Sequence, residues 1–351
     1  MIGRGLRLRR RLWLVLAGLF LLVAAPVFRL TGGDGRIEYI GVPRLQLPMP
    51  SAPPGMSPVG ADAERASAAS AGLAAMPPVF PALIEENRFG PLPRIGPDGR
   101  RPLLAYARPF DLDDQRPRLA LLVVGLGLQA DLSQAAIALP GEVSLQFSAY
   151  APDLPGWVGR ARRAGHEVLL DLPMQPPDYP ASDPGPHGLL ATASDEDNLQ
   201  RLDWLLARAT GYVAVAGSGA GFAGSGRAAA VLDVLARRGL ALVELGERHL
   251  EAGAGAVGLP YASAPTAIDA ELSLPSIERA LARLETEALR QGSALVLVQG
   301  YPSSLERLRR WTASLRDKGL VLAPVSALLI RQPWLAAAAR GGAEPRGRSQ
   351  S

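Results

Sequence analysis

The sequence predicts an α/β domain built on a parallel β-sheet, and three observations support this fold class. Short apolar runs recur along the middle and C-terminal parts of the chain, amphipathic helical patterns separate most of them, and glycines stand where most of the helices give way to a strand. Regular alternation of strands and helices is typical of a parallel sheet with crossover helices.

The predicted strands are short and strongly apolar. Residues 119–124 form a continuous aliphatic run that ends at Gly125, as expected of a strand buried on both faces. Six further runs bring the total to about seven parallel strands, at 143–147, 167–170, 212–215, 240–244, 294–298 and 320–324. Periodicity does not decide between an open sheet and an incomplete barrel, but either fold places functional groups at the carboxyl ends of its strands.

The predicted helices lie between these runs, at 132–139, 154–164, 195–209, 227–238, 276–291 and 304–318. Ser194 followed by three acidic residues is typical of a helix N-cap and first turn. The expected C-terminal glycines are Gly165, Gly211, Gly239, Gly292 and Gly319.

The N-terminal segment predicts a membrane anchor. Residues 12–28 are apolar and uncharged over 17 positions, which is close to the shortest helix that spans a bilayer. Five arginines precede this segment between Arg4 and Arg11, and basic residues are retained on the cytoplasmic side. Pro26 directly after Ala24-Ala25 disfavours signal-peptide cleavage. We therefore expect a single-pass protein of the bacterial inner membrane with a periplasmic C-terminal domain.

Composition divides the chain into four parts. The stub and anchor occupy 1–30, a Pro- and Ala-rich linker expected to be disordered occupies 31–82, the folded domain occupies 83–332, and a disordered tail follows at 333–351. The chain has no cysteine, which excludes disulfides and suits an exported protein. A net charge of +4, with basic residues gathered at the termini, predicts no nucleic-acid partner.

Residues 125–130 match a dinucleotide-binding pattern. Gly125-Leu126-Gly127-Leu128-Gln129-Ala130 follows the first predicted strand, where glycines allow a pyrophosphate to approach a helix N-terminus. No acidic residue ends a second strand about 20 residues later, as such folds require. A tight strand-to-loop turn is the favoured interpretation, and binding through Gly125 and Gly127 is a weaker alternative.

A proline-rich loop after the third predicted strand carries the main candidate polar groups. Asp171 stands at the strand end, and Asp178 and His187 follow in the loop. These groups can line a polar cleft as acid, base or weak ligands, or they can be turn-capping and surface residues.

A glycine-rich loop at 216–226 follows the next strand and contains Ser218, which is a further candidate for binding. Its amides can hold an anion, although a permissive loop without function is the preferred interpretation. Ser218 could join a histidine and Asp269 in a catalytic triad, but no nucleophile-elbow motif positions it. The three histidines show no metal-ligand spacing.

Several ordered strings of residues resemble the divergent polysaccharide deacetylases of bacterial envelopes over about residues 83–332. The strings include Tyr106-Ala107-Arg108-Pro109-Phe110, Tyr150-Ala151-Pro152-Asp153-Leu154, Leu172-Pro173-Met174, Asp183-Pro184-Gly185-Pro186 and Pro324-Val325-Ser326-Ala327-Leu328. The resemblance implies a distorted (β/α) barrel of the glycoside hydrolase/deacetylase type.

The departures from the family pattern predict a loss of its metal site. Val124 and Gly125 stand where the family has paired aspartates, Asp171 replaces a histidine, and the loop around Ser218 lacks another. Asp171 and Glu244 remain as candidate catalytic carboxylates, but they do not supply three ligands and a base. We therefore expect no metal and no cofactor.

The favoured interpretation is a pseudoenzyme that binds envelope glycan or an envelope protein. An active carbohydrate esterase using Asp171 and Glu244 is the alternative. The sequence does not predict the oligomeric state.

Overall fold

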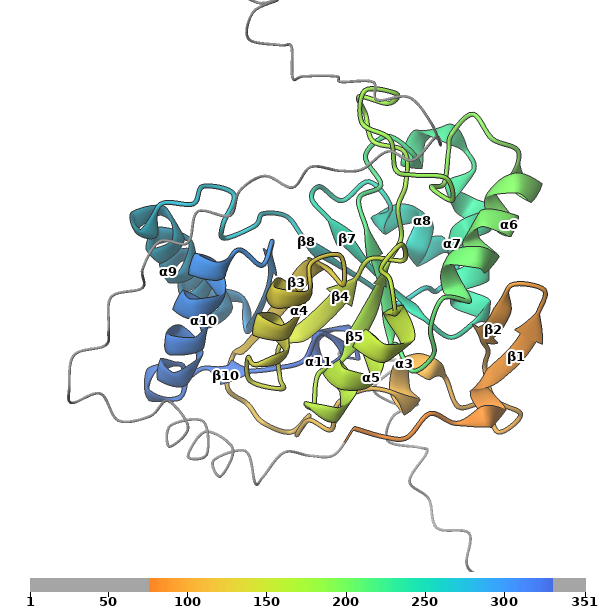
Figure 1. The fold of residues 1–351 in the computed structure, drawn as a ribbon. Coiled ribbons are helices and arrows are strands. Elements are labelled where there is room, and N and C mark those ends of the chain that lie inside the picture. The colour runs from red at the N-terminus through yellow and green to blue at the C-terminus, as the bar shows by residue number, and fades with distance from the viewer. Residues whose placement is uncertain (1–75, 331–351) are drawn as a thin grey trace, which may run out of the picture. The chain divides into compact units, whose positions relative to one another are not determined.

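The computed structural model describes residues 76–330. The predicted anchor at 12–28, most of the linker and the tail at 333–351 lie outside the described residues. Within residues 76–330, no helix has both the length and the hydropathy needed to cross a membrane. Strands and helices alternate along this part of the chain (Figure 1).

Seven parallel strands form a nearly closed barrel. They are β3 (Arg118–Leu126), β4 (Ser144–Phe147), β5 (Val168–Asp171), β6 (Ala214–Gly217), β7 (Ala241–Leu245), β8 (Tyr261–Ala264) and β9 (Ser293–Val298). Neighbours in the chain pair from β3 to β8, and β9 pairs with β3 over six residues. A single bridge between Ala267 and Leu297 joins the segment after β8 to β9. The predicted barrel of about seven parallel strands is confirmed.

The membership of the barrel differs from the prediction in one strand. β8 was not predicted, because its four residues Tyr-Ala-Ser-Ala form no apolar run. The run at 320–324 instead contributes β10 (Val321–Leu322), a two-residue strand that pairs with the beginning of β3. The strand predicted at 212–215 is β6, which begins two residues later at Ala214.

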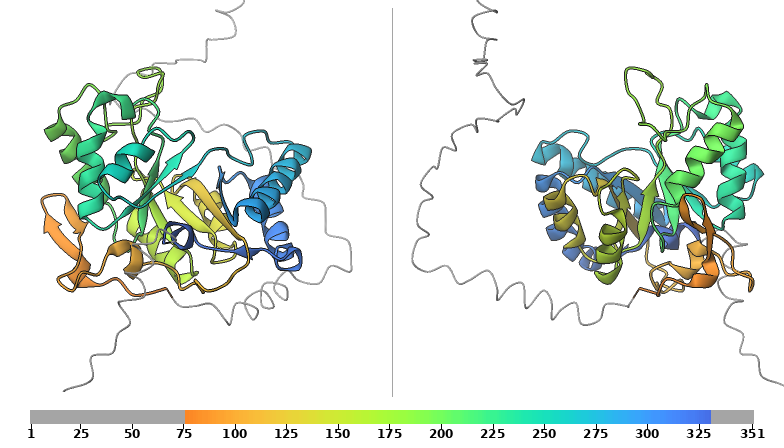
Figure 2. Two further views of the ribbon diagram at one scale, coloured as in Figure 1. Left: turned by 180° about the vertical axis from the view of Figure 1, so that it is seen from behind. Right: turned by 45° about the vertical axis from the view of Figure 1, so that its right-hand side comes forward.

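The larger helices lie outside the ring of strands (Figure 2). They are α4 (Ala130–Ile137), α5 (Leu154–Arg163), α6 (Asp195–Leu206), α7 (Ala228–Arg237), α8 (Glu251–Ala256), α9 (Leu274–Gln291) and α10 (Pro302–Ser314). The Ser194 hydroxyl accepts a hydrogen bond from the amide of Asp197, which confirms the predicted N-cap. Shorter elements are η1 (Pro81–Leu83), the hairpin β1 (Ile84–Asn87) and β2 (Gly90–Pro93), α3 (Pro102–Ala105), η2 (Ala223–Ser225), η3 (Arg316–Lys318) and α11 (Val325–Leu329).

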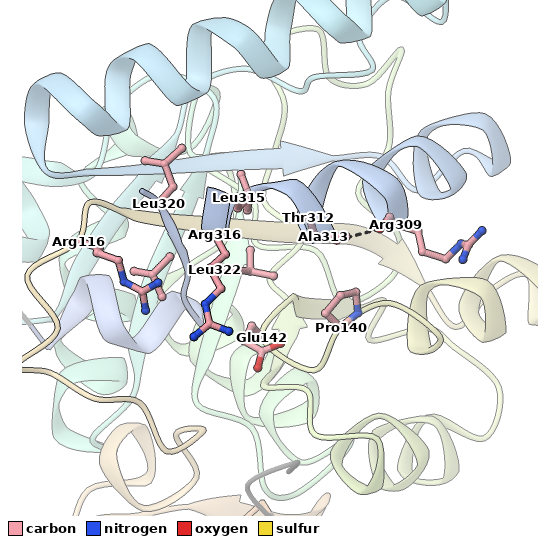
Figure 3. A pocket seen from close by; sticks show the side chains of 11 residues that line it. Arg116, Pro140, Glu142, Arg309, Thr312, Ala313, Leu315, Arg316, Leu320 and Leu322 are labelled. Carbon is pink, nitrogen blue, oxygen red and sulfur yellow. Dashed lines mark hydrogen bonds between the residues drawn. The ribbon is translucent and has the colours of Figure 1, made fainter. Parts of the chain in front are cut away.

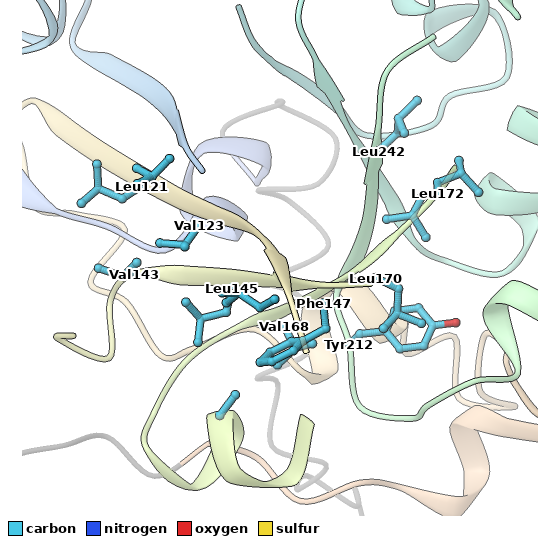
Figure 4. Packing of buried hydrophobic residues seen from close by; sticks show 14 of the residues in the cluster. Leu121, Val123, Val143, Leu145, Phe147, Val168, Leu170, Leu172, Tyr212 and Leu242 are labelled. Atoms are coloured by element: carbon cyan, nitrogen blue, oxygen red, sulfur yellow. The ribbon is translucent and has the colours of Figure 1, made fainter. Parts of the chain in front are cut away.

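Alternation along each strand separates two hydrophobic cores. The larger core lies between the sheet and the helices and includes Leu121, Leu145, Leu170 and Leu242 (Figure 4). The smaller core fills the barrel and consists of residues such as Ala120, Leu122, Leu169, Ala216 and Val243. Small alanines on β6 and β7 fit the narrow interior, as expected of a filled barrel rather than a pore.

The amino ends of the strands are covered by protein. Leu103, Tyr106 and the residues of α11 belong to the inner core at this end. The buried carboxylate of Glu167 accepts hydrogen bonds from the amides of Arg108 (2.8 Å) and Ser326 (3.1 Å) and so holds both covering segments. Pro77, which precedes the predicted start of the domain at 83, accepts a hydrogen bond from Arg162 through its carbonyl oxygen. The carboxyl end is therefore where functional groups can be reached from solvent.

Candidate functional site

Asp171 ends β5 and faces the interior of the barrel at its carboxyl end. Its neighbour Leu170 belongs to the outer core, so alternation directs Asp171 inward. The Nε2 group of Gln146 on β4 donates to Asp171 Oδ1 at 2.9 Å, and Gln146 Oε1 accepts from the amide of Gly125 on β3 at 2.7 Å. Three adjacent strands are thus connected through one amide side chain.

The surroundings of Asp171 favour its protonated form. Burial raises the pKa of this carboxyl from 3.8 to about 7, against a smaller lowering by the hydrogen bond from Gln146. A group that titrates near neutrality at a strand end can accept or donate a proton, which is typical of functional carboxyls.

Glu244 lies on the opposite face of the sheet from Asp171. Val243 belongs to the inner core and Leu242 to the outer core, so Glu244 points outward. Its carboxylate is fully buried and accepts hydrogen bonds from the amides of His249 (3.1 Å) and Leu250 (2.9 Å) and from the hydroxyl of Tyr261 (2.6 Å). The structure does not bring the two candidate carboxylates together, and Glu244 serves to hold the loop after β7.

The two other candidates in the loop after β5 occupy different surroundings. Asp178 is exposed and accepts a hydrogen bond from the hydroxyl of Ser182 at 2.6 Å, as a turn residue does. The ring of His187 stacks on Trp204 of α6 at a centroid distance of 3.7 Å. Partial burial lowers the pKa of His187, and the nearby charges of Arg201 and Arg208 lower it further.

Tyr150 connects this loop to the barrel end, and the prediction missed both it and Gln146. The hydroxyl of Tyr150 donates to the carbonyl of Pro184 (3.2 Å) and accepts from the amide of His187 (3.1 Å). Burial raises the pKa of Tyr150, and the negative charge of Asp171 contributes to the increase. The available signal for Gln146 was its polar side chain within the predicted strand 143–147, where Ser144 is the other polar residue.

Ser218 is exposed at the end of β6, in a glycine-rich loop in which Gly217 and Gly221 have a packing role. A Cβ atom on Gly217 would lie 2.1 Å from the carbonyl oxygen of Leu172, and one on Gly221 would lie 2.4 Å from that of Gln175. The loop after β6 therefore packs directly on the backbone of the loop after β5. The structure explains these glycines without a bound anion.

We predict that Gly217→Ala destabilises the domain, because its methyl group meets backbone that has no free rotamer to adopt. Overpacking of this kind costs about 1–3 kcal/mol, and the short contact places this site at the upper end. Gly224→Ala is the matched control, since a Cβ there would have no neighbour within 4 Å. Thermal unfolding followed by circular dichroism should show a lower Tm for the first variant alone, and equal Tm values would contradict the packing role.

The amides of the dinucleotide-like motif are already used by the protein. Gly125 donates to Gln146, and the amide of Gly127 donates to the hydroxyl of Ser133 at 2.8 Å. A Cβ atom on Gly127 would lie 2.5 Å from the side chain of Ala151. These contacts support the tight-turn interpretation.

The residues present do not fit a catalytic metal ion. No group of three or more His, Asp or Glu side chains within residues 76–330 is arranged to hold one. One carboxyl oxygen of Asp171 already accepts a hydrogen bond from Gln146. Both carboxylate oxygens of Glu244 accept hydrogen bonds from backbone amides, and one of them also accepts from the Tyr261 hydroxyl. Asp269, the acidic member of the conceivable triad, directs both carboxylate oxygens to the amide of Gln299 at 2.9 and 3.1 Å.

One solved structure has a similar fold. A solved structure of an uncharacterized protein from Agrobacterium tumefaciens C58 shares 36% identity and a TM-score of 0.65, covering 68% of this chain and 99% of its own. A putative fructose-1,6-bisphosphate aldolase from Coccidioides immitis gives 17% identity and a TM-score of only 0.27, covering 68% of this chain and 90% of its own. No curated protein matches.

The sequence pattern of the divergent polysaccharide deacetylases matches residues 121–329, which is more than half of the chain and includes every strand of the barrel after the start of β3. The resemblance seen in the sequence is confirmed, and the chain belongs to the divergent polysaccharide deacetylase family.

Proposed function

We propose that this protein binds envelope carbohydrate at the carboxyl end of the barrel and does not carry out metal-dependent deacetylation. The observation that carries the proposal is the hydrogen-bonded pair of Asp171 and Gln146, with Tyr150 close enough to feel the charge of Asp171, at the end where barrels of this kind hold their ligands. Amide, carboxyl and phenol groups are suitable partners for sugar hydroxyls. Because the residues at this end of the barrel do not fit a metal ion, we propose carbohydrate binding without the metal-dependent reaction of the family.

Binding of N-acetylglucosamine oligomers and of peptidoglycan fragments, measured by isothermal titration calorimetry, tests this proposal. Asp171→Asn keeps the shape of the side chain but removes the carboxyl, so we expect about tenfold weaker binding, as for one lost hydrogen bond to a charged or acidic group. Asp317→Asn at the opposite end of the barrel is the control and should bind normally. Equal binding by both variants would contradict a role for Asp171.

Catalysis by Asp171 alone is a second candidate, because a carboxyl with a pKa of about 7 can act as a general base at neutral pH. Acetate release from the same oligomers, with and without added zinc, cobalt or nickel, separates the two candidates. Zinc-stimulated acetate release would overturn the non-metal proposal. Release that needs no metal and disappears in Asp171→Asn would favour the esterase.

We further propose that the protein is anchored in the inner membrane by residues 12–28, with its domain in the periplasm. The apolar run and the preceding arginines support this orientation. Alkaline phosphatase fused after residue 330 should therefore be active, because that enzyme needs an oxidising compartment to form its disulfides. An inactive fusion that is present in normal amounts would contradict export.

A further inference from the structure

A pocket at the amino end of the barrel combines an apolar floor with guanidinium groups. It has a volume of about 370 Å³ and lies between the C-terminal half of α10, the strand β10 and the connection from α4 to β4. Its apolar lining comes from Pro140, Ala313, Leu315, Leu320 and Leu322. This end is opposite to Asp171, so the pocket is separate from the proposed carbohydrate site.

The polar side of the pocket is mainly cationic. Arg116, Arg309 and Arg316 line it together with one carboxylate, that of Glu142 (Figure 3). Figure 3 shows Arg116 and Arg316 on the same side as Glu142, whereas Arg309 extends away on the other side. The charge of Glu142 is balanced by Arg108, whose Nη2 group lies 2.7 Å from its Oε1 atom. Arg116 and Arg309 are in turn paired with Asp114 and Glu306, so Arg316 is the lining arginine without an ion pair among residues 76–330.

The arginines retain donors for a ligand. Asp114 engages the Nε and Nη2 groups of Arg116, which leaves Nη1 without a partner among residues 76–330. The guanidinium of Arg316 is exposed and forms no hydrogen bond or ion pair within the same residues. Two guanidinium groups beside an apolar floor suit a molecule that carries a phosphate at one end and hydrocarbon at the other.

We propose that this pocket binds one anionic lipid molecule, with its phosphate at Arg116 and Arg316 and the beginning of its acyl chain on Pro140 and Leu322, which are partly exposed. The choice of a membrane lipid as the source rests on the proposed anchor, which keeps the domain beside a bilayer. Charge decides between lipid classes, because the cationic lining favours phosphatidylglycerol-type headgroups over zwitterionic ones.

Photo-cross-linking to the full-length protein in a neutral detergent tests the proposal. The probe is lysophosphatidylglycerol with a diazirine in its acyl chain, and labelled peptides are mapped by mass spectrometry. We expect labelling within residues 312–322, reduced at least tenfold in Arg116→Gln/Arg316→Gln. Ala313→Trp fills the floor from an exposed position and should also block labelling without unfolding the protein.

Controls distinguish lipid binding from simpler explanations. Arg283→Gln/Arg290→Gln removes two arginines from a second hollow, on α9, and should leave labelling unchanged. Equal labelling by the matching lysophosphatidylcholine probe would overturn the proposal, as would unchanged labelling in the Arg116/Arg316 variant. Competition by inorganic phosphate at concentrations similar to the lipid would show an anion site and would also overturn it. The reporter fusion tests export separately, so failure of the anchor and failure of the pocket are distinguishable.

Discussion

Replacing Glu244 by alanine is expected to lower the free energy of unfolding by about 3 kcal/mol or more. The substitution removes the acceptor of the Leu250 amide, which is buried, and one acceptor each of the His249 amide and the Tyr261 hydroxyl, which are partly buried. Each buried donor left unpaired costs about 1–3 kcal/mol, and the lost side chain also leaves a cavity beside Leu250. Urea unfolding of the full-length protein, followed by circular dichroism, measures the change.

Two further variants show whether the effect comes from these hydrogen bonds. Glu244→Gln keeps one acceptor but turns an NH2 group toward a donor, so we expect an intermediate loss of stability. Glu247→Ala removes a nearby carboxylate that is 89% exposed and should change stability by no more than about 0.5 kcal/mol. If Glu244→Ala instead folds with wild-type stability and only loses carbohydrate binding, Glu244 belongs to the functional site after all.

The strand-and-helix order of the domain was predictable because buried parallel strands and amphipathic helices leave strong local patterns. Residues 119–124 and 294–298 are almost wholly aliphatic, and they form the strand pair that completes the ring. Closure of the barrel depends on the pairing of β9 with β3 and on the single bridge from Ala267 to Leu297. These contacts join residues far apart in the chain, so no local sequence pattern predicts them. β8 was missed because Ala262, which packs against the inner core, and Ser263, which is level with Glu244 on the outer face, form no apolar run.

The site was less predictable than the fold because it depends on which face of a strand each residue occupies. Asp171 and Glu244 both stand at strand ends, and the sequence places them at the same edge of the sheet. Register shows the difference: Asp171 is level with Ala216 and Val243 inside the barrel, whereas Glu244 is level with Gly217 on the outside. A shift of one residue moves a side chain to the other face, and strand ends cannot be placed that accurately from sequence.

The glycines show a similar limit. The sequence marks both glycine-rich loops but does not distinguish a phosphate-binding loop from one packed on its own backbone. Gly127 and Gly217 belong to the second kind, because a side chain at either position would collide with protein. What decides between the two is the neighbouring loop, which lies far away in sequence.

The folded state should hold a proton on Asp171 that the unfolded chain releases, so Asp171→Asn should stabilise the protein increasingly as the pH rises. In the unfolded chain the carboxyl ionises near 3.8, whereas burial delays ionisation in the folded domain to about pH 7. Below pH 3.8 both states are protonated and the carboxyl adds no penalty. Between these two values the penalty grows, and above pH 7 it stays constant.

The size of this effect follows from the raised pKa. A difference of about three pKa units corresponds to about 4 kcal/mol, which is an upper limit because Asp171 keeps some contact with water. The advantage of Asp171→Asn should therefore be larger by about 2–3 kcal/mol at pH 8 than at pH 5. Urea unfolding of both proteins at the two pH values measures it.

Asp178→Asn supplies the comparison, because it makes the same change of side chain at an exposed position of the loop after β5. An advantage of Asp171→Asn that is the same at both pH values would mean that Asp171 ionises normally in the folded protein. Its proposed roles as a neutral hydrogen-bonding group below pH 7 and as a base above it would then lose their physical basis. A stability gain that grows with pH would instead show that burying Asp171 costs the folded protein stability. Functional sites commonly carry such a cost, whereas a carboxylate with a structural role, such as Glu244, need not.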